Sequence, residues 1–226
     1  MSHEGEGGEF DVLTFDCYGT LIDWHGGVRA AAAELPGLEG VDLERLELDR
    51  EAADMELGRG PYRPYGEILA ESLVRAAAQQ GREVRDDEAE RFARSMSAWR
   101  PFEDSRWALE RLSRRYRLAI LSNVETRVLE ASVEQLGVTF ELLITAEEVR
   151  SYKPAPRHFE VALDRLGCPK DALLHVACSL YHDVRPAQAL GIESAFVDRD
   201  GRAIPEDLHP RYVAPDLATL ADVIGC

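Results

Sequence analysis

The chain has almost no lysine and almost no asparagine. Of its 26 basic residues only Lys153 and Lys170 are lysines, and Asn123 is the single asparagine among 226 residues. Arginine supplies the other positive charges, so a position that keeps lysine or asparagine is one where the chemistry of that side chain is needed. Lys153 and Asn123 are therefore candidates for a functional site.

Long apolar runs and an excess of positive charge are also missing. No apolar run approaches the roughly 18 residues that cross a bilayer, and the polar start MSHEGEGGEF lacks the apolar core of a signal peptide. These features predict a cytoplasmic protein with no membrane partner. The net charge of −16 would repel nucleic-acid phosphates, so we expect no nucleic-acid partner. A small anionic substrate is still compatible with this charge, because a pocket can be locally positive.

Cysteine is scarce and is not arranged for metal binding. The four cysteines form no C-x-x-C pair, and no histidine stands at zinc-finger spacing from them. A disulfide framework is not expected in a chain of this size without a secretion signal, so we expect reduced thiols. The hydrophobic content of 45% is enough to bury a sizeable core and argues against disorder.

Apolar runs and helix-like segments alternate through the second half of the chain. Residues 10–15 are strand-like, and from residue 103 onward the runs RLAILS, FELLIT, ALLHVAC and ESAFVD each follow a helix-like segment. Strands that alternate with helices of about 10–15 residues indicate β-α-β units and a parallel sheet. We therefore predict an α/β fold, a Rossmann-like doubly wound parallel sheet formed by residues 9–23 and 103–226.

Residues 24–102 interrupt this core directly after its first strand. Their helix-forming segments include residues 43–57, 67–81 and 85–99, and Asp86 or Asp87 is the expected N-cap of the third. The segment GRGPYRPYG at residues 58–66 separates two of these helices, because proline and glycine disrupt helical geometry. The sequence thus predicts an all-helical insertion at residues 24–102.

Polar side chains follow four of the predicted strands. In open α/β sheets, ligands bind beyond the carboxyl ends of the strands, where these loops meet. The first of the loops contains Gly19 and Thr20, and its backbone N–H groups could bind an anion. The residues gathered at this edge are Asp16, Tyr18, Thr20, Ser122, Asn123, Lys153, Cys178, Ser179 and Asp183. Their common placement predicts a functional site.

Each of these residues also has an ordinary structural explanation. Ser122 or Asn123 could cap the helix expected at residues 126–136, and Asp183 could cap the helix that starts near Val184. Lys153 could be a surface charge, although Pro154 holds its backbone extended. A helix cap does not exclude a catalytic role, so both interpretations stay open at this point.

Four of these segments resemble the four motifs of the haloacid dehalogenase superfamily. They are DCYGT at the first strand end, LAILSN at the second, SYKPAP around Lys153, and ACSLYHD at residues 177–183. The motifs occur in the family's order and cover essentially the whole predicted core. The helical insertion resembles the family's cap domain in position and in helicity. The resemblance implies a hydrolase that uses Asp16 as a covalent nucleophile.

Two residues distinguish between branches of this superfamily. In the phosphatase branch an acid stands two residues after the nucleophile, and another begins the fourth motif and helps to hold Mg²⁺. Tyr18 and Cys178 occupy those positions here. Asp16 and Asp183 alone would bind Mg²⁺ only weakly, because a hard cation prefers several oxygen ligands. The sequence instead resembles the L-2-haloacid dehalogenase branch, which works without a metal or cofactor.

That branch implies a two-step reaction on a small 2-haloacid. Asp16 would displace the halide and form an ester, and Asp183 would activate the water that cleaves the ester. Lys153 would lie beside both carboxylates and keep Asp16 ionised. A cap arginine would receive the halide, and the candidates are Arg50 and Arg63, the latter on a proline-stiffened loop. The residues expected to contact substrate or carboxylates are Tyr18, Thr20, Ser122, Asn123, Ser179 and Arg63.

Several alternatives remain at this point. They are a phosphatase with a poorer metal site, a hydrolase of another small electrophile such as a strained ring, and a binding protein on a decayed hydrolase core. A Cys178 nucleophile paired with His182 or His175 is disfavoured, because the adjacent Asp183 would raise the pKa of the thiol. The sequence does not identify the substrate or the oligomeric state, for which a homodimer is one option.

Overall fold

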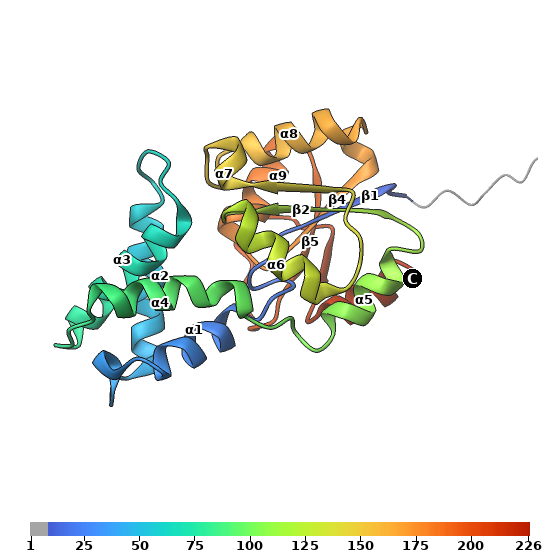
Figure 1. Ribbon diagram of the computed structural model, residues 1–226. Coiled ribbons are helices and arrows are strands. Elements are labelled where there is room, and N and C mark those ends of the chain that lie inside the picture. The colour runs from blue at the N-terminus through green and yellow to red at the C-terminus, as the bar shows by residue number, and fades with distance from the viewer. Residues whose placement is uncertain (1–8) are drawn as a thin grey trace, which may run out of the picture.

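A six-stranded parallel sheet forms the centre of the computed structural model, which describes residues 9–226 (Figure 1). The strand order is β3-β2-β1-β4-β5-β6, which is the Rossmann order. The strands are β1 (Val12–Phe15), β2 (Arg117–Ser122), β3 (Leu142–Thr145), β4 (Leu173–Ala177), β5 (Glu193–Val197) and β6 (Tyr212–Ala214). The predicted α/β fold with a doubly wound sheet is confirmed. Of the polar segment MSHEGEGGEF, only Glu9 and Phe10 lie within the described residues.

The central strands are apolar on both sides because helices cover both faces of the sheet. Every residue of β1 and β4 is buried, so neither strand shows the alternation of a half-exposed sheet. One face packs against α5 (Ser105–Leu112), α6 (Thr126–Leu136) and α10 (Leu217–Val223). The other packs against α8 (Arg157–Leu166) and α9 (Arg185–Leu190). The short helix α7 (Ala146–Val149) and the 3-10 turn η3 (Lys170–Ala172) complete the core.

The insertion is helical throughout, as predicted. Figure 1 shows its helices grouped beside the sheet, on the side toward which the arrows of β2 and β3 point. The chain leaves and re-enters the core along paired segments, because Asp23 N–H donates to Arg100 O (2.9 Å) and Phe102 N–H donates to Leu21 O (3.1 Å). Its elements are α1 (Trp24–Ala33), η1 (Pro36–Leu38), α2 (Leu43–Leu57), α3 (Tyr65–Gln79), α4 (Asp86–Ser95) and η2 (Met96–Ala98). Its separation as a domain at residues 24–102 stays a prediction.

The expected N-cap of α4 is wrong by one residue. Arg85 is the N-cap, and Asp86 is already the first helical residue. The buried carboxylate of Glu88 accepts from the N–H of Arg85 (3.0 Å) and from that of Gly37 (3.2 Å). Glu88, the third residue of the helix, therefore satisfies the backbone N–H of the N-cap residue, which is the contact that the third residue makes in a capping box.

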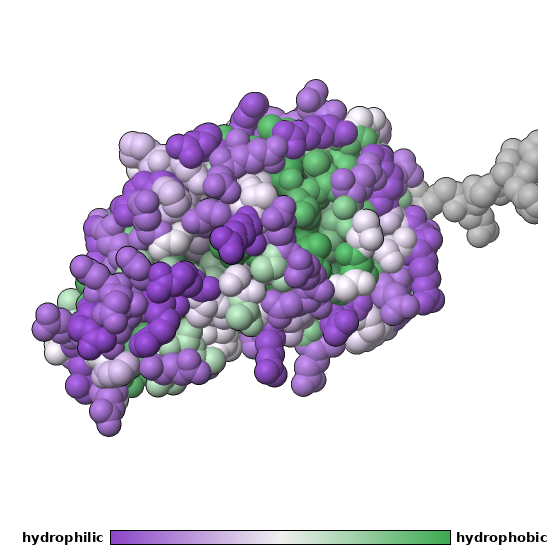
Figure 2. All heavy atoms as spheres, in the orientation of Figure 1, coloured by the Kyte–Doolittle hydropathy of each residue, from purple (hydrophilic) through white to green (hydrophobic). Residues whose placement is uncertain are grey.

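The face of the molecule seen in Figure 2 is mainly hydrophilic, which agrees with the charge of −16. Apolar side chains gather on it between α8 and α6, where the edge strand β3 runs. Leu142 and Leu143 of β3 are half-buried there. None of the helices among residues 9–226 has both the length and the apolar character of a membrane span.

Candidate active site

A cavity of about 390 Å³ lies where the strand ends face the helical insertion, and its size suits a small molecule. From the core, its lining includes Asp16, Tyr18, Ser122, Asn123, Lys153, Cys178, Ser179 and Asp183. From the insertion, it includes Trp24, His25, Arg50, Glu51, Asp54 and Tyr65. The structure therefore brings most of the predicted site residues together. Thr20 lies directly behind Asp16, and Arg63 is not part of the lining.

Lys153 joins the two predicted catalytic carboxylates. Its Nζ donates to Asp16 Oδ1 (2.9 Å), to Asp183 Oδ1 (2.6 Å) and to the carbonyl oxygen of Leu121 (2.8 Å). Lys153 and Asp183 are almost fully buried, and Asp16 is only 8% exposed. One ammonium group thus uses three acceptors in a dry environment, where charge pairs interact strongly. The alternative that Lys153 is a surface charge is excluded.

The same contacts set the ionisation of this cluster. Burial alone would lower the pKa of Lys153, but the charges of Asp16 and Asp183 offset it and hold that pKa above its ordinary value. Burial would raise the pKa of Asp183, but the charge of Lys153 and the hydrogen bond from His175 hold it below its usual range. Both groups are therefore charged at neutral pH.

The loop after β1 presents Asp16 and holds its second oxygen. Thr20 Oγ1 donates to Asp16 Oδ2 (2.7 Å) and accepts from the N–H of Cys178 (2.9 Å). Gly19 has φ +89°, and a Cβ there would lie 2.8 Å from the Cys178 sulfur. Glycine is required on both counts. The N–H of Gly19 donates to Ile22 O (2.8 Å), so this amide is not free to bind an anion as we expected.

Asn123 positions the loop that carries Lys153. Its Oδ1 accepts from the Lys153 N–H (2.7 Å), and its Nδ2 donates to the Lys153 carbonyl (3.1 Å). The helix-cap alternative for Ser122 or Asn123 is wrong, because the N-cap of α6 is Glu125. His158 Nε2 lies 3.2 Å from the Ser122 carbonyl oxygen, and burial, followed by the Lys153 charge, lowers the pKa of His158 to about 3. His158 is thus a neutral donor beside the cluster.

Asp183 lies in an irregular turn that the sequence does not reveal. Residues Leu180–Val184 form a π-helical turn, η4, that leads directly into α9. Its N-cap is Ser179, whose Oγ accepts from the N–H of His182 (3.0 Å). The expected capping role of Asp183 is wrong, because its side chain contacts Lys153 and His175 instead. Such turns often occur at functional sites because they redirect a side chain out of the regular helical path.

Tyr18 forms an apolar wall of the cavity. Its hydroxyl contacts Ser132 Oγ (2.7 Å) in α6, and its ring makes edge contacts with Trp24 (6.2 Å) and Trp99 (6.3 Å). Burial raises the pKa of Tyr18 well above its ordinary value, so the phenol stays neutral. Tyr18 thus cannot replace a carboxylate that handles a proton or a metal.

Arg50 presents a buried guanidinium group without hydrogen-bond partners. It is 0% exposed, and its Nε, Nη1 and Nη2 atoms make no hydrogen bond within residues 9–226. Its Nη1 lies 3.9 Å from Asp54 Oδ2, and its guanidinium lies 4.8 Å from the Trp24 ring centroid. A buried cation with unused donors is costly unless an anion joins it. Arg50 therefore brings unused hydrogen-bond donors to the lining of the cavity.

The structure corrects the assignment of Arg63. Its guanidinium donates to Glu71 (2.8 Å) and to Glu67 (3.4 Å) on α3. Only its backbone approaches the core, where its carbonyl accepts from the Tyr152 hydroxyl (2.7 Å). Glu67 and Glu71 lie one turn apart on α3, and together they bind this guanidinium away from the cavity. Of the two candidate arginines, Arg50 is the one at the cavity.

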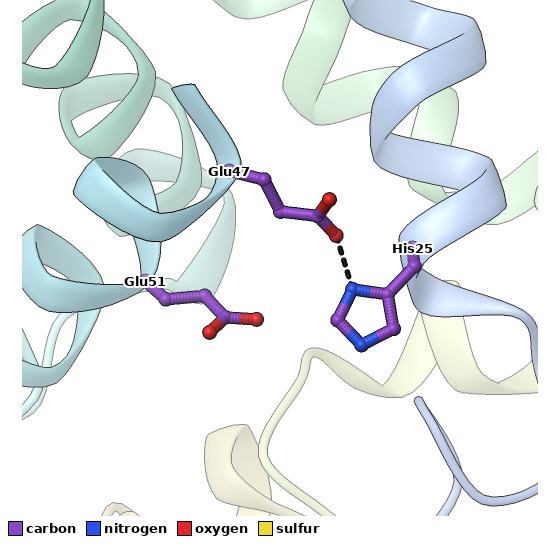
Figure 3. Close-up of side chains that lie close together, drawn as sticks. All are labelled: His25, Glu47 and Glu51. Carbon is purple, nitrogen blue, oxygen red and sulfur yellow. Dashed lines mark hydrogen bonds and ion pairs between the residues drawn. The ribbon is translucent and has the colours of Figure 1, made fainter. Parts of the chain in front are cut away.

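His25 of α1 lies against Glu47 and Glu51 of α2 at one side of the cavity (Figure 3). Their nearest ligand atoms lie within 4.8 Å of one another, and Figure 3 shows Glu47 bonded to the His25 ring. The second oxygen of Glu47 accepts from Arg29 Nε (2.9 Å). Both oxygens of this buried carboxylate already have donors, so the cluster acts as an ion-pair network that joins α1 to α2.

The side chains around Asp16 do not provide the oxygen ligands that a hard divalent cation needs. Asp16 and Asp183 both contact the ammonium of Lys153, and the next groups are the thiol of Cys178 and the neutral phenol of Tyr18. Mg²⁺ needs several oxygen ligands in octahedral geometry. Burial and then Asp16 raise the pKa of Cys178 to about 12, so the thiol is neither a ligand nor a nucleophile at neutral pH. The expected weak Mg²⁺ binding stays a prediction.

Similarity to known proteins points to one family. A family model for haloacid dehalogenase-like hydrolases matches residues 10–199. Haloacetate dehalogenase H-2 of Moraxella sp. (strain B) is 31% identical over 223 residues, which cover 96% of this chain and 99% of the relative. An (S)-2-haloacid dehalogenase of Pseudomonas putida is 27% identical over 216 residues, which cover 93% and 94%.

Solved structures agree with the fold. A dehalogenase described as an intermediate complex superposes with a TM-score of 0.85 at 24% identity, with 96% of this chain and 97% of that chain covered. An L-2-haloacid dehalogenase from Xanthobacter autotrophicus, with chloropropionic acid covalently bound, gives a TM-score of 0.78 at 22% identity, with 95% and 98% covered. The sheet and the helical insertion thus occur together in these neighbours.

Proposed function

Because the chain belongs to the haloacid dehalogenase-like hydrolase family and is a hydrolase, we propose that it removes the halogen of a small 2-haloacid. The observation that carries this proposal is the arrangement in the cavity. Asp16 and Asp183 share the ammonium of Lys153, and the unpartnered guanidinium of Arg50 lines the same space. A nucleophile, a base and an anion site are what a dehalogenase needs. The names of the curated relatives support the same reaction.

In the first step a carboxylate oxygen of Asp16 attacks the carbon that carries the halogen. The new C–O bond forms as the carbon–halogen bond breaks, and its electron pair leaves with the halide. Arg50 would receive this anion, since its three side-chain nitrogens make no hydrogen bond among residues 9–226. Lys153 Nζ donates to Asp16 Oδ1 (2.9 Å) and so holds the nucleophile in place before the attack.

In the second step water cleaves the aspartyl ester. Asp183 takes a proton from water, and the resulting hydroxide adds to the ester carbonyl carbon of Asp16. The tetrahedral intermediate then collapses and expels the alkoxide, which takes the proton from Asp183 and leaves as the 2-hydroxy acid. The new carboxyl group of Asp16 releases its proton to solvent, and both carboxylates are regenerated. Lys153 contacts one Asp16 oxygen (2.9 Å) and Thr20 the other (2.7 Å), so either oxygen has a donor when it becomes the oxyanion.

The substrate would lie between polar loops of the core and aromatic side chains of the insertion. We assign its carboxylate to the loops that contain Ser122, Asn123 and Ser179, which line the cavity. Tyr18 and Trp24 bound the space on the apolar side. The reaction in this proposal uses no cofactor, because the attacking and proton-accepting groups are both side chains of the chain itself.

Halide release from a panel of 2-chloro and 2-bromo acids tests this function. We expect release that exceeds the uncatalysed background, with a preference for one enantiomer because the cavity walls are chemically different. An aryl phosphate with Mg²⁺ is the second arm of the experiment. Phosphate release well above background, with no halide release from any acid, would replace the dehalogenase proposal by the phosphatase alternative.

Arg50 and Arg63 form a matched pair that tests the anion site. We expect Arg50→Met to slow halide release by roughly 100-fold, because the leaving halide loses a preorganised cation. Thermal stability should fall as well, because the substitution leaves the carboxylate of Asp54, which lies 3.9 Å from Arg50 Nη1, without its ion-pair partner. Arg63→Met should leave turnover within about threefold. Equal losses in both variants would contradict the assignment of Arg50.

The remaining parts of the proposal rest mainly on the sequence. A cytoplasmic location is proposed, and the charge of −16 supports the absence of nucleic-acid partners. The division into a core and a helical cap at residues 24–102 is likewise proposed. The homodimer stays a prediction that sedimentation analysis can check.

A further inference from the structure

His175 lies beneath the site, between the sheet and the catalytic cluster. It belongs to β4, is 0% exposed, and faces Thr14 of β1 in the parallel register. Its Nδ1 lies 2.9 Å from Thr14 Oγ1, and its Nε2 lies 3.0 Å from Asp183 Oδ1. A buried polar chain therefore runs from the central strand to the residue that we assign as the base.

The partners of His175 determine which nitrogen carries the proton. Asp183 is a carboxylate and can only accept, so Nε2 is the protonated nitrogen and donates to it. Nδ1 lies beside the Thr14 hydroxyl, a group that can either donate to this nitrogen or accept from it. Both ring nitrogens thus have a polar partner, and the ring is held further by an edge contact with Phe159 at 4.8 Å.

This contact makes the two oxygens of Asp183 different. Oδ1 accepts from Lys153 (2.6 Å) and from His175 (3.0 Å), whereas Oδ2 has no hydrogen-bond partner within residues 9–226. Asp183 also lines the cavity. Two donors from different elements prevent the carboxylate from rotating, because rotation would break both bonds. Oδ2 is therefore the oxygen left to accept a proton.

We propose that His175 is a positioning residue for ester hydrolysis, which holds Asp183 so that Oδ2 meets the attacking water. The proposal rests on the proposed function, because it assigns a role within the second step of that reaction. The first step uses Asp16, Lys153 and Arg50 and does not need a free oxygen on Asp183. Loss of His175 should consequently separate the two steps. A purely structural role would weaken both steps together.

His175→Leu and His175→Gln test this inference by rapid-mixing kinetics with a 2-haloacid. In His175→Leu we expect a first burst of halide equal to the enzyme concentration, followed by turnover slowed by about 10–100-fold. Intact-mass analysis should show the aspartyl ester accumulating on Asp16. Glutamine places an N–H donor near the position of Nε2, so His175→Gln should recover most of the turnover.

The pH profile gives a second readout. The hydrogen bond from His175 helps to hold the pKa of Asp183 low, so its loss should move the acid limb of kcat toward higher pH. Thr14→Val keeps the imidazole but removes its hydroxyl partner. It should also move the acid limb toward higher pH, but by a smaller amount than loss of His175 does. This variant serves if His175→Leu does not fold.

Two results would separate failure of this inference from failure of the function. If the wild-type protein releases no halide from any acid, the proposed function itself is wrong. If the wild-type protein turns over, the inference is overturned by His175→Leu with a wild-type kcat, or with burst and kcat reduced equally. If Thr14→Val leaves the acid limb of kcat unchanged, this result also counts against the inference.

Discussion

Asp16→Asn is expected to reduce halide release by on the order of 10⁴-fold or more while leaving the protein folded. The amide of asparagine does not attack carbon at a useful rate, and no other carboxylate is held at the end of β1. The fold should persist, because Lys153 still donates to Asp183 Oδ1 (2.6 Å) and to Leu121 O (2.8 Å). Asparagine also keeps an oxygen that Thr20 can contact.

The measurement is halide release together with the mass of the protein after incubation with substrate. Asp183→Asn is the matched comparison, because it alters the other carboxylate on the same ammonium group. It should still form the ester on Asp16 and then stop, so its mass should rise by that of the carboxyalkyl group that the acid transfers. Asp16→Asn should show no adduct. An adduct on Cys178 in either variant would mean that the nucleophile is wrongly assigned.

The sequence predicts the core of the fold well, because a doubly covered parallel sheet needs continuous apolar strands. The run RLAILS corresponds to β2 residue for residue, and the helix expected at residues 43–57 is α2. The edge strand β6 was missed since it has three residues, one of them exposed. The π-helical turn at Leu180–Val184 was also missed, because its wider winding depends on contacts that local propensity does not contain.

The catalytic motif residues were predictable because strand ends converge in a parallel sheet. The insertion was harder, since the choice between Arg50 and Arg63 depends on tertiary placement. Arg50 lines the cavity, whereas Arg63 precedes α3 and pairs with Glu67 and Glu71 of that helix. The positioning contact of His175 was not predicted, although one signal was present. A histidine inside the apolar run LLHVA must have a buried partner, but the sequence does not say that this partner is Asp183.

Lys153→Met is expected to destabilise the protein by roughly 3–5 kcal/mol at neutral pH and to abolish turnover. Two carboxylates would remain close together without their shared cation. Lys170→Met is the natural control, because Lys170 is the only other lysine. Its ammonium contacts the Leu190 carbonyl (2.8 Å) at an exposed position, so the control should change stability by less than about 0.5 kcal/mol.

The pH dependence of this loss shows whether charge or packing causes it. In the native protein Asp183 has a lowered pKa, so its contribution to stability is present above the ordinary carboxyl pKa and is lost as the pH falls. Without Lys153, burial should raise the pKa of Asp183, so the folded variant would bind a proton more tightly than the unfolded chain. The variant should then gain stability as the pH falls from about 7 toward 5, and its deficit relative to wild type should shrink. Urea unfolding at both pH values measures this, and a deficit that stays constant would indicate lost packing around the lysine side chain instead of unpaired charge.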